Sequence, residues 1–221
     1  MKTTILCLET ATTNCSVALT VNGKVVSVRE ENSKKHAHAE KLHVFIEEVL
    51  HDAQIGKKEI DAIAVSKGPG SYTGLRIGVS AAKGLAFALD IPIITIGTLN
   101  VLAQQVKDQV DFIIPLLDAR RMEVYGAVFD NNKNQIRDIR AEILTPSSFA
   151  EFLGTGKCIF IGDGAAKFRT VSDFNNAAFL PDRYPSAKEM GELALDKYKI
   201  GDFDDVAYFE PFYLKEFIPG K

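Results

Sequence analysis

The order of the predicted strands and helices constrains the fold most, because it runs once and then begins again about 110 residues later. The first pass has strands at 5–8, 15–21 and 24–29, a helix at 38–53, a strand at 60–66, a helix at 73–89, a strand at 92–96 and a helix at 98–107. The second has strands at 112–117, 123–129 and 135–144, a helix at 146–153, a strand at 158–161 and, after a less regular stretch, a helix at 186–199. The repetition predicts an internal duplication.

The first strand of each half ends in a carboxylate, Glu9 in one and Asp118 in the other. Three antiparallel strands followed by alternating helix and strand predict α/β lobes, each a mixed sheet with flanking helices. Two such lobes around a cleft, with one carboxylate from each side, form the actin-like (ASKHA) superfold of ATPases and sugar kinases. We therefore expect a duplicated two-lobe fold, with an N-terminal lobe at 1–108 and a C-terminal lobe at 109–221.

Composition excludes several classes of function. The net charge is −3 and no basic block is longer than a pair, so tight independent binding of nucleic acid is not expected. No apolar run reaches the roughly 18 residues of a membrane span, and the N-terminus lacks the features of a signal peptide. The odd number of cysteines, all in predicted strands, indicates reduced core residues in a cytoplasmic protein: Cys7, Cys15 and Cys158.

The loop at 67–76 has the composition of a special strand-to-helix connection. Its glycines tolerate positive φ, and both Ser71 and Thr73 can cap the helix that follows. Two interpretations are open, a tight turn or an anion cradle at a helix N-terminus. The phosphate-binding templates fit poorly, because Gly74 is followed by Leu75 rather than Lys, and Thr73 stands where the dinucleotide motif needs Gly.

Small residues recur along the helix predicted at 73–89. A glycine inside a helix is about 1 kcal/mol less favourable than alanine, so several of them indicate that another backbone packs closely against the helix. That neighbour is either part of the same chain or a helix of a partner, and the pattern does not decide between them. The small residues are Gly74, Gly78, Ala81, Ala82, Gly84 and Ala88.

A nucleotide cleft is the first candidate for chemistry, with Glu9 and Asp118 as Mg²⁺ ligands. An actin-like ATPase usually has Asp-x-Gly-Thr at its first turn, whereas this chain has Glu-Thr-Ala-Thr at 9–12. A degenerate cleft is therefore favoured over phosphoryl transfer, and a nucleotide-dependent kinase is the alternative. Simple turn carboxylates are the structural alternative. The candidate residues of a vestigial nucleotide cleft are Glu9, Thr10, Asp118, Gly162 and Gly164.

The histidines do not have the spacing of a metal site. His38 and His43 are five residues apart, about 140° around a helix, and His36 lies roughly 10 Å from His43 along the axis. We therefore expect no metal, and exposed or capping histidines at a helix start.

Several motifs together resemble the bacterial TsaB (YeaZ) family. The most specific is Gly-Pro-Gly-Ser-Tyr-Thr-Gly-Leu-Arg-Ile-Gly at 68–78. Further similarities are the segments at 5–12 and 15–19, His-Ala-Glu-Lys-Leu at 38–42, Asp-Ala-Arg-Arg at 118–121 with Glu-Val-Tyr at 123–125, and Glu-Pro-Phe-Tyr-Leu at 210–214. The chain departs from many relatives at Glu9, where they carry Asp.

The resemblance implies a non-catalytic accessory protein of tRNA threonylcarbamoyladenosine synthesis. It implies docking to the catalytic paralogue TsaD, an ATPase named TsaE in the same assembly, TsaC as the source of threonylcarbamoyl-adenylate, and a homodimer in isolation. It implies tRNA contact only through the complex, and no cofactor beyond a vestigial nucleotide. TsaD carries an HxxxH metal pair, whereas this chain has Leu42 four residues after His38. A metallopeptidase, the other alternative function, would therefore lack its second metal ligand.

The same resemblance implies that helices 38–53 and 73–89 of the N-terminal lobe form the partner surface. Part of their apolar stripe must also face the sheet of the protein itself. The candidate interface residues are His38, Leu42, Phe45, Ile46, Val49, Gly74, Arg76, Gly78 and Ala81.

Overall fold

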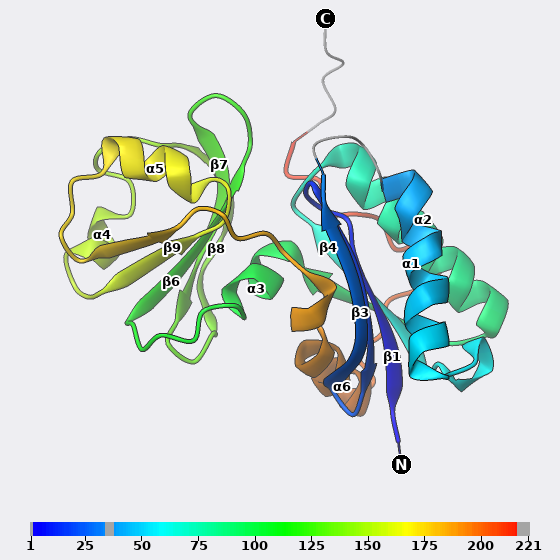
Figure 1. The fold of residues 1–221 in the computed structure, drawn as a ribbon. Coiled ribbons are helices and arrows are strands. Elements are labelled where there is room, and N and C mark those ends of the chain that lie inside the picture. The colour runs from blue at the N-terminus through cyan, green and yellow to red at the C-terminus, as the bar shows by residue number, and fades with distance from the viewer. Residues whose placement is uncertain (1, 34–37, 216–221) are drawn as a thin grey trace, which may run out of the picture. The chain divides into compact units, whose positions relative to one another are not determined.

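A computed structural model describes residues 2–33 and 38–215, which divide into two compact units (Figure 1). The first unit holds the described residues up to Val101 together with those from Pro185 onwards, and the second is Leu102–Tyr184. The predicted lobes, 1–108 and 109–221, differ from this division chiefly at the end of the chain: the described residues from Pro185 onwards belong to the first unit. Burial explains this difference, because three apolar residues near the end pack against β-strand residues of the first unit: Ala187, Met190 and Ala194.

The first unit is built on a five-stranded mixed sheet in the order β3-β2-β1-β4-β5. The first three strands are antiparallel neighbours, whereas β1, β4 and β5 run parallel. The β2–β3 hairpin turns at Asn22 and Gly23, whose φ values are 51° and 78°, as the Asn-Gly pair predicts. The strands are β1 (Thr4–Glu9), β2 (Asn14–Val21), β3 (Lys24–Asn32), β4 (Ala62–Gly68) and β5 (Ile93–Gly97).

The second unit repeats this sheet in the order β10-β9-β6-β7-β8. Strands β6, β7 and β8 are antiparallel neighbours, and β6, β9 and β10 run parallel, so each strand has a counterpart in the first unit. The predicted duplication is confirmed. The strands are β6 (Phe112–Asp118), β7 (Glu123–Asp130), β8 (Gln135–Ile143), β9 (Cys158–Ile161) and β10 (Ala177–Leu180).

Helices cover both faces of the first sheet. The apolar stripe of α1 (His38–Ala53) packs with residues of α2 (Tyr72–Leu89) over one face, and η2 (Ala187–Glu189) and α6 (Gly191–Ile200) cover the other. The short η1 (Lys57–Glu59) precedes β4, and α3 (Thr98–Ala103) follows β5.

Short elements of the second unit escaped the sequence prediction. The helix expected at 146–153 is only α4 (Ala150–Leu153), because Phe149 before it has a φ of 61° and the residues from 146 form turns. Helix α5 (Ala165–Val171) and strand β10 were missed, because seven residues are too few to show a helical period and Ala-Ala-Phe-Leu in β10 lacks the β-branched residues present in β9. The helix expected at 98–107 ends earlier, at Ala103. The helix expected at 186–199 is divided into two elements, η2 and α6.

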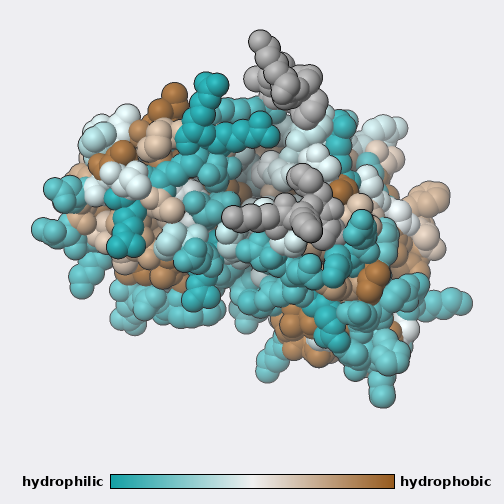
Figure 2. All heavy atoms as spheres, turned by 45° about the horizontal axis from the view of Figure 1, so that its top comes forward, coloured by the Kyte–Doolittle hydropathy of each residue, from teal (hydrophilic) through white to brown (hydrophobic). Residues whose placement is uncertain are grey.

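Hydrophilic and hydrophobic side chains are interspersed over the face shown in Figure 2. Across residues 2–33 and 38–215, none of the helices combines the length and apolarity that crossing a membrane requires.

The glycines of α2 lie directly against the turn between β1 and β2. A Cβ atom at Gly74 would be 2.1 Å from the carbonyl oxygen of Thr10, and one at Gly78 would be 2.2 Å from Thr10 Oγ1. Thr10 Oγ1 also donates a hydrogen bond to the carbonyl oxygen of Gly74 at 2.7 Å. The close neighbour of these two glycines is therefore the protein's own first turn. Gly84 differs, because no described atom lies within 4 Å of a Cβ placed there.

Gly74→Ala and Gly84→Ala form a matched pair that tests this packing. Gly74→Ala pushes a methyl group into backbone and should lower the free energy of unfolding by about 1–3 kcal/mol. Gly84→Ala adds a better helix former in open space and should raise it by about 0.5–1 kcal/mol. Urea unfolding of both variants provides the measurement, and equal effects would contradict the close approach at Gly74.

Candidate functional site

The loop before α2 lies closed against the β1–β2 turn. The backbone N–H of Ser71 donates to the carbonyl oxygen of Ala11 at 2.7 Å, and a Cβ at Gly70 would lie 2.3 Å from the same oxygen. Ser71 caps the helix, since its Oγ accepts a hydrogen bond from the N–H of Gly74 at 3.2 Å. The backbone of the first turn therefore takes the space beside the loop, and the geometry favours the tight-turn interpretation over an anion cradle.

Glu9, the carboxylate at the end of β1, is fully buried, with 0% of its surface exposed. Its Oε1 accepts a hydrogen bond from the N–H of Ala11 at 2.6 Å. Oε2 has no hydrogen-bond partner among the described residues. Burial raises the pKa of the Glu9 carboxyl to about 7, although the Ala11 N–H and the Ser66 hydroxyl lower it in part. Glu9 therefore holds its own turn and is shielded from solvent ions.

The corresponding carboxylate of the second unit, Asp118, is exposed but engaged. Its Oδ1 accepts hydrogen bonds from the backbone N–H of Arg120 at 2.6 Å and from Lys167 Nζ at 2.7 Å. The N–H of Asp118 donates to Asp163 Oδ1 at 2.9 Å, and burial raises the pKa of the Asp163 carboxyl. An ammonium group thus sits where a cation would bind Asp118.

The two glycines predicted for the nucleotide turn, Gly162 and Gly164, pack against β6. A Cβ at Gly162 would lie 2.3 Å from the carbonyl oxygen of Leu116, and φ of Gly162 is 114°. These glycines satisfy a close strand-to-turn contact, which is the simpler of the two interpretations of this turn.

Within each unit the structure brings some of the predicted residues together: Thr10 contacts Gly74 and Gly78 of α2, and Asp118 contacts Asp163 in the turn at 162–164. Sequence reasoning missed Asp163 and Lys167 as partners of Asp118. Lys167 lies on the unpredicted α5, so no periodic signal was available to find it.

Most of the predicted interface residues lie inside the first unit. The apolar stripe of α1 joins the core over the sheet, and His38 Nε2 makes a hydrogen bond with the Thr12 carbonyl oxygen at 2.7 Å. Arg76 is exposed, and its guanidinium lies over the Tyr72 ring, 4.2 Å from the ring centroid, and bonds Tyr213 Oη. The buried members of the predicted interface are thus covered by the chain itself in this structure. They are His38, Leu42, Phe45, Ile46, Val49, Gly74 and Gly78, whereas Ala81 is half-buried.

The described ranges contain no group of three or more His, Cys, Asp or Glu side chains close enough to hold a metal ion. Leu42, the residue at the spacing of a second ligand after His38, points into the core. His36 lies outside the described residues.

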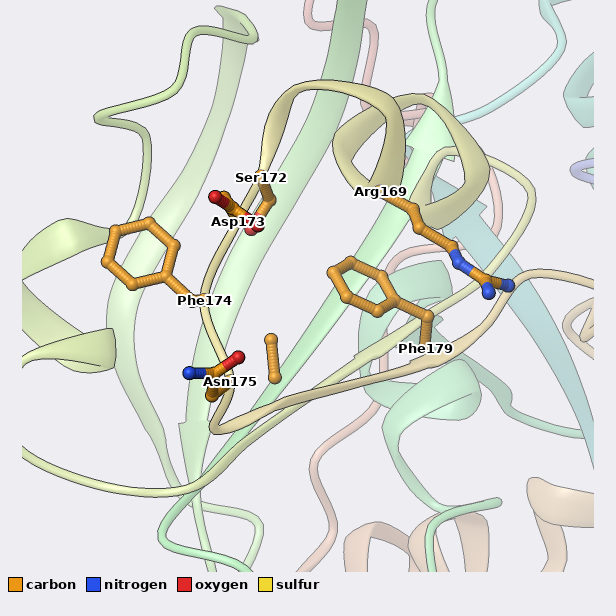
Figure 3. Close-up of a pocket in the computed structure, with 7 residues that line it drawn as sticks. Arg169, Ser172, Asp173, Phe174, Asn175 and Phe179 are labelled. Carbon is orange, nitrogen blue, oxygen red and sulfur yellow. The ribbon is translucent and has the colours of Figure 1, made fainter.

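A surface pocket lies in the second unit, between the end of α5 and the start of β10 (Figure 3). The Asp173 and Arg169 side chains lie toward opposite ends of it in this view. None of the residues predicted for a site lines the pocket. Its lining residues are Arg169, Ser172, Asp173, Phe174, Asn175, Ala177 and Phe179.

The raised pKa of Glu9 predicts a pH dependence of stability that Glu9→Gln should remove. The folded state binds the proton more tightly than the unfolded state, whose pKa is near 4.5, so stability falls as the pH rises from about 4.5 through 7. The loss is roughly 3 kcal/mol at most. Urea unfolding between pH 4.5 and 8 should show a smaller fall for Glu9→Gln than for the parent chain, and identical pH profiles would contradict this environment for Glu9.

The chain is similar to proteins of one tRNA modification pathway. A family model described as TsaD, tRNA N6-adenosine threonylcarbamoyltransferase, matches residues 27–214. The tRNA threonylcarbamoyladenosine biosynthesis protein TsaB of Haemophilus influenzae is 31% identical, over 99% of this chain and 96% of that protein. The TsaB of Escherichia coli is 29% identical, over 98% and 96%. YeaZ from Pseudomonas aeruginosa, a solved structure, has a TM-score of 0.83 and 27% identity, covering 96% of this chain and 100% of that one.

These similarities extend over nearly the whole length of the chain, as did the motifs in its sequence. The two mixed five-stranded sheets with flanking helices have the duplicated topology of the actin-like ATPase superfold, as predicted. The chain therefore belongs to the TsaB (YeaZ) family of tRNA threonylcarbamoyladenosine biosynthesis proteins and is related to TsaD.

Proposed function

We propose that this chain is a non-catalytic subunit that docks on TsaD and supports the transfer of a threonylcarbamoyl group to tRNA. The observation that carries the proposal is the complete burial of Glu9 at the end of β1, where its Oε1 accepts a hydrogen bond from the N–H of Ala11 in its own turn. A Mg²⁺ ligand must be ionised and within reach of the ion. Glu9 is out of reach of an ion because it is fully buried, and burial raises its pKa to about 7, so that its carboxyl is only partly ionised at neutral pH.

The second unit supports the same proposal. Asp118, the other candidate Mg²⁺ ligand, is neutralised by Lys167 Nζ at 2.7 Å. A nucleotide-dependent kinase would need to displace this ammonium group from Asp118 and to expose Glu9. The kinase alternative therefore needs changes in both units, whereas a docking subunit needs none.

The docking surface that we propose is the solvent side of α1 and α2, which lie next to each other in Figure 1. Val44 on α1 is 50% exposed and Phe87 on α2 is 82% exposed. Gly84 lies on the exposed side of α2, where nothing in the described chain compensates its poor helix propensity. Close approach of a partner helix at Gly84 supplies that compensation.

In this proposal the same surface serves a homodimer in isolation and the TsaD heterodimer in the assembly. A typical stable interface buries about 800 Å² per partner. The subunit acts by favouring the TsaD conformation that binds adenylate and tRNA, which requires a difference in affinity between TsaD states. The ATPase TsaE joins the assembly, and the protein works in the cytoplasm, where tRNAs are modified.

Val44→Asp tests the docking surface, with Ile143→Asp as its matched control. Val44 is exposed on α1 and Ile143 is 69% exposed on β8, so the introduced aspartate is solvated in the free chain in either variant. If TsaD covers α1 at this position, the carboxylate of Val44→Asp is buried without a partner of opposite charge. This cost should weaken the affinity for TsaD at least about tenfold. Co-purification and mass in solution are the readouts. Val49 is unsuitable because it is a core residue.

The control should pair like the parent chain. A folded Val44→Asp variant that pairs normally with TsaD would contradict the proposed surface, as would equal losses for the two variants.

A further inference from the structure

The turn between β6 and β7 has an unusual backbone for its sequence. Arg120 and Arg121 have φ values of 70° and 49°, in the left-handed region that residues with side chains rarely adopt. The hairpin between β2 and β3 needs the same conformation and uses Asn22 and Gly23, the residue types that adopt it most readily. Two arginines at this turn are therefore a poor choice for folding alone.

Both arginine side chains are exposed at the tip of this turn. In the described part of the chain neither guanidinium makes an ion pair, in contrast to those of Arg29 and Arg137. Asp118, two residues before Arg120, is held by Lys167 Nζ and by the backbone N–H of Arg120. The two guanidinium groups are thus left available to an outside anion.

The backbone around the arginines is well fixed. The N–H of Ala119 bonds the Glu123 carbonyl oxygen at 3.0 Å, and the N–H of Glu123 bonds the Arg120 carbonyl oxygen at 3.1 Å. The turn lies at the same end of its sheet as the start of α5, where Asp163 contacts Asp118 (Figure 1). Figure 2 turns this end toward the viewer and shows hydrophilic side chains projecting there. Ligands of α/β sheets bind at the carboxyl ends of parallel strands.

We infer that Arg120 and Arg121 contact the phosphate backbone of the tRNA once this chain is part of the TsaD complex. Guanidinium groups bind phosphate oxygens with two parallel hydrogen bonds, and such contacts position a nucleic acid without reading its sequence. Two charges give little affinity alone, which agrees with the weak nucleic-acid binding expected from the composition. The inference rests on the proposed function, because it presupposes an assembly that holds tRNA.

The test measures tRNA affinity of the complex reconstituted with TsaD between about 50 and 200 mM salt. Arg120→Gln with Arg121→Gln should weaken binding at low salt by tenfold or more and reduce the slope of log affinity against log salt by about 2. The matched control is Arg140→Gln with Arg183→Gln, which removes two exposed arginines of the same unit and should leave both quantities unchanged.

A second double variant, Arg120→Asn with Arg121→Gly, places the Asn-Gly pair of the β2–β3 hairpin at this turn. Because these residues adopt the left-handed conformation readily, the variant should fold, and a loss of tRNA affinity cannot then be attributed to misfolding. It should melt about 2–4 °C higher than the parent chain and lose tRNA affinity to the same extent. Retained tRNA affinity in either double variant, or an equal loss of tRNA affinity in the control, would overturn the inference.

Complex formation is measured first, without tRNA. Failure of the parent chain to pair with TsaD would overturn the proposed function. The tRNA inference alone fails when the variants assemble normally and bind tRNA as the parent does.

Discussion

The contact of Gly74 and Gly78 with the β1–β2 turn sets the position of α2 in the first unit. Gly70, Gly74 and Gly78 bring a loop and a helix within backbone distance of Thr10 and Ala11. The contact fixes where α2 lies on the sheet, and α2 with α1 completes the apolar core over that face. A side chain at either of the first two glycines would separate helix and turn by more than a tightly packed interior tolerates.

The same contact has a consequence for function. In a phosphate-binding fold the first turn must leave room for a ligand, whereas here the turn is covered and Glu9 is buried beneath it. Lys167 produces a similar result in the second unit by engaging Asp118. The two candidate Mg²⁺ ligands are thus engaged by different means: Glu9 is buried, whereas the exposed Asp118 is paired with Lys167. In the proposed function, the exposed helix surface and the exposed turn are the parts through which the chain acts.

Much of the fold followed from the sequence, because long periodic elements carry their own signal. The stripe of α1, the Asn22-Gly23 hairpin and the repeated strand order all predicted what the structure contains. The short α5 and β10 gave no such signal, and Lys167 was missed with them. Sequence also could not show which side of α1 and α2 is covered, since Leu42 and Val49 suit a core and an interface equally well. The packing of Gly74 and Gly78 against Thr10 shows that the close neighbour of these two glycines is internal.

In the proposed function this chain contributes to tRNA modification by docking and performs no chemistry of its own. Threonylcarbamoyladenosine formation and ATP hydrolysis, measured with the purified chain alone and then with TsaD, TsaE and substrates, test it most directly. The account predicts no turnover by the chain alone, stimulation of product formation when it is added to the other components, and undiminished stimulation by Glu9→Gln. Turnover by the isolated chain that Glu9→Gln abolishes would contradict the account.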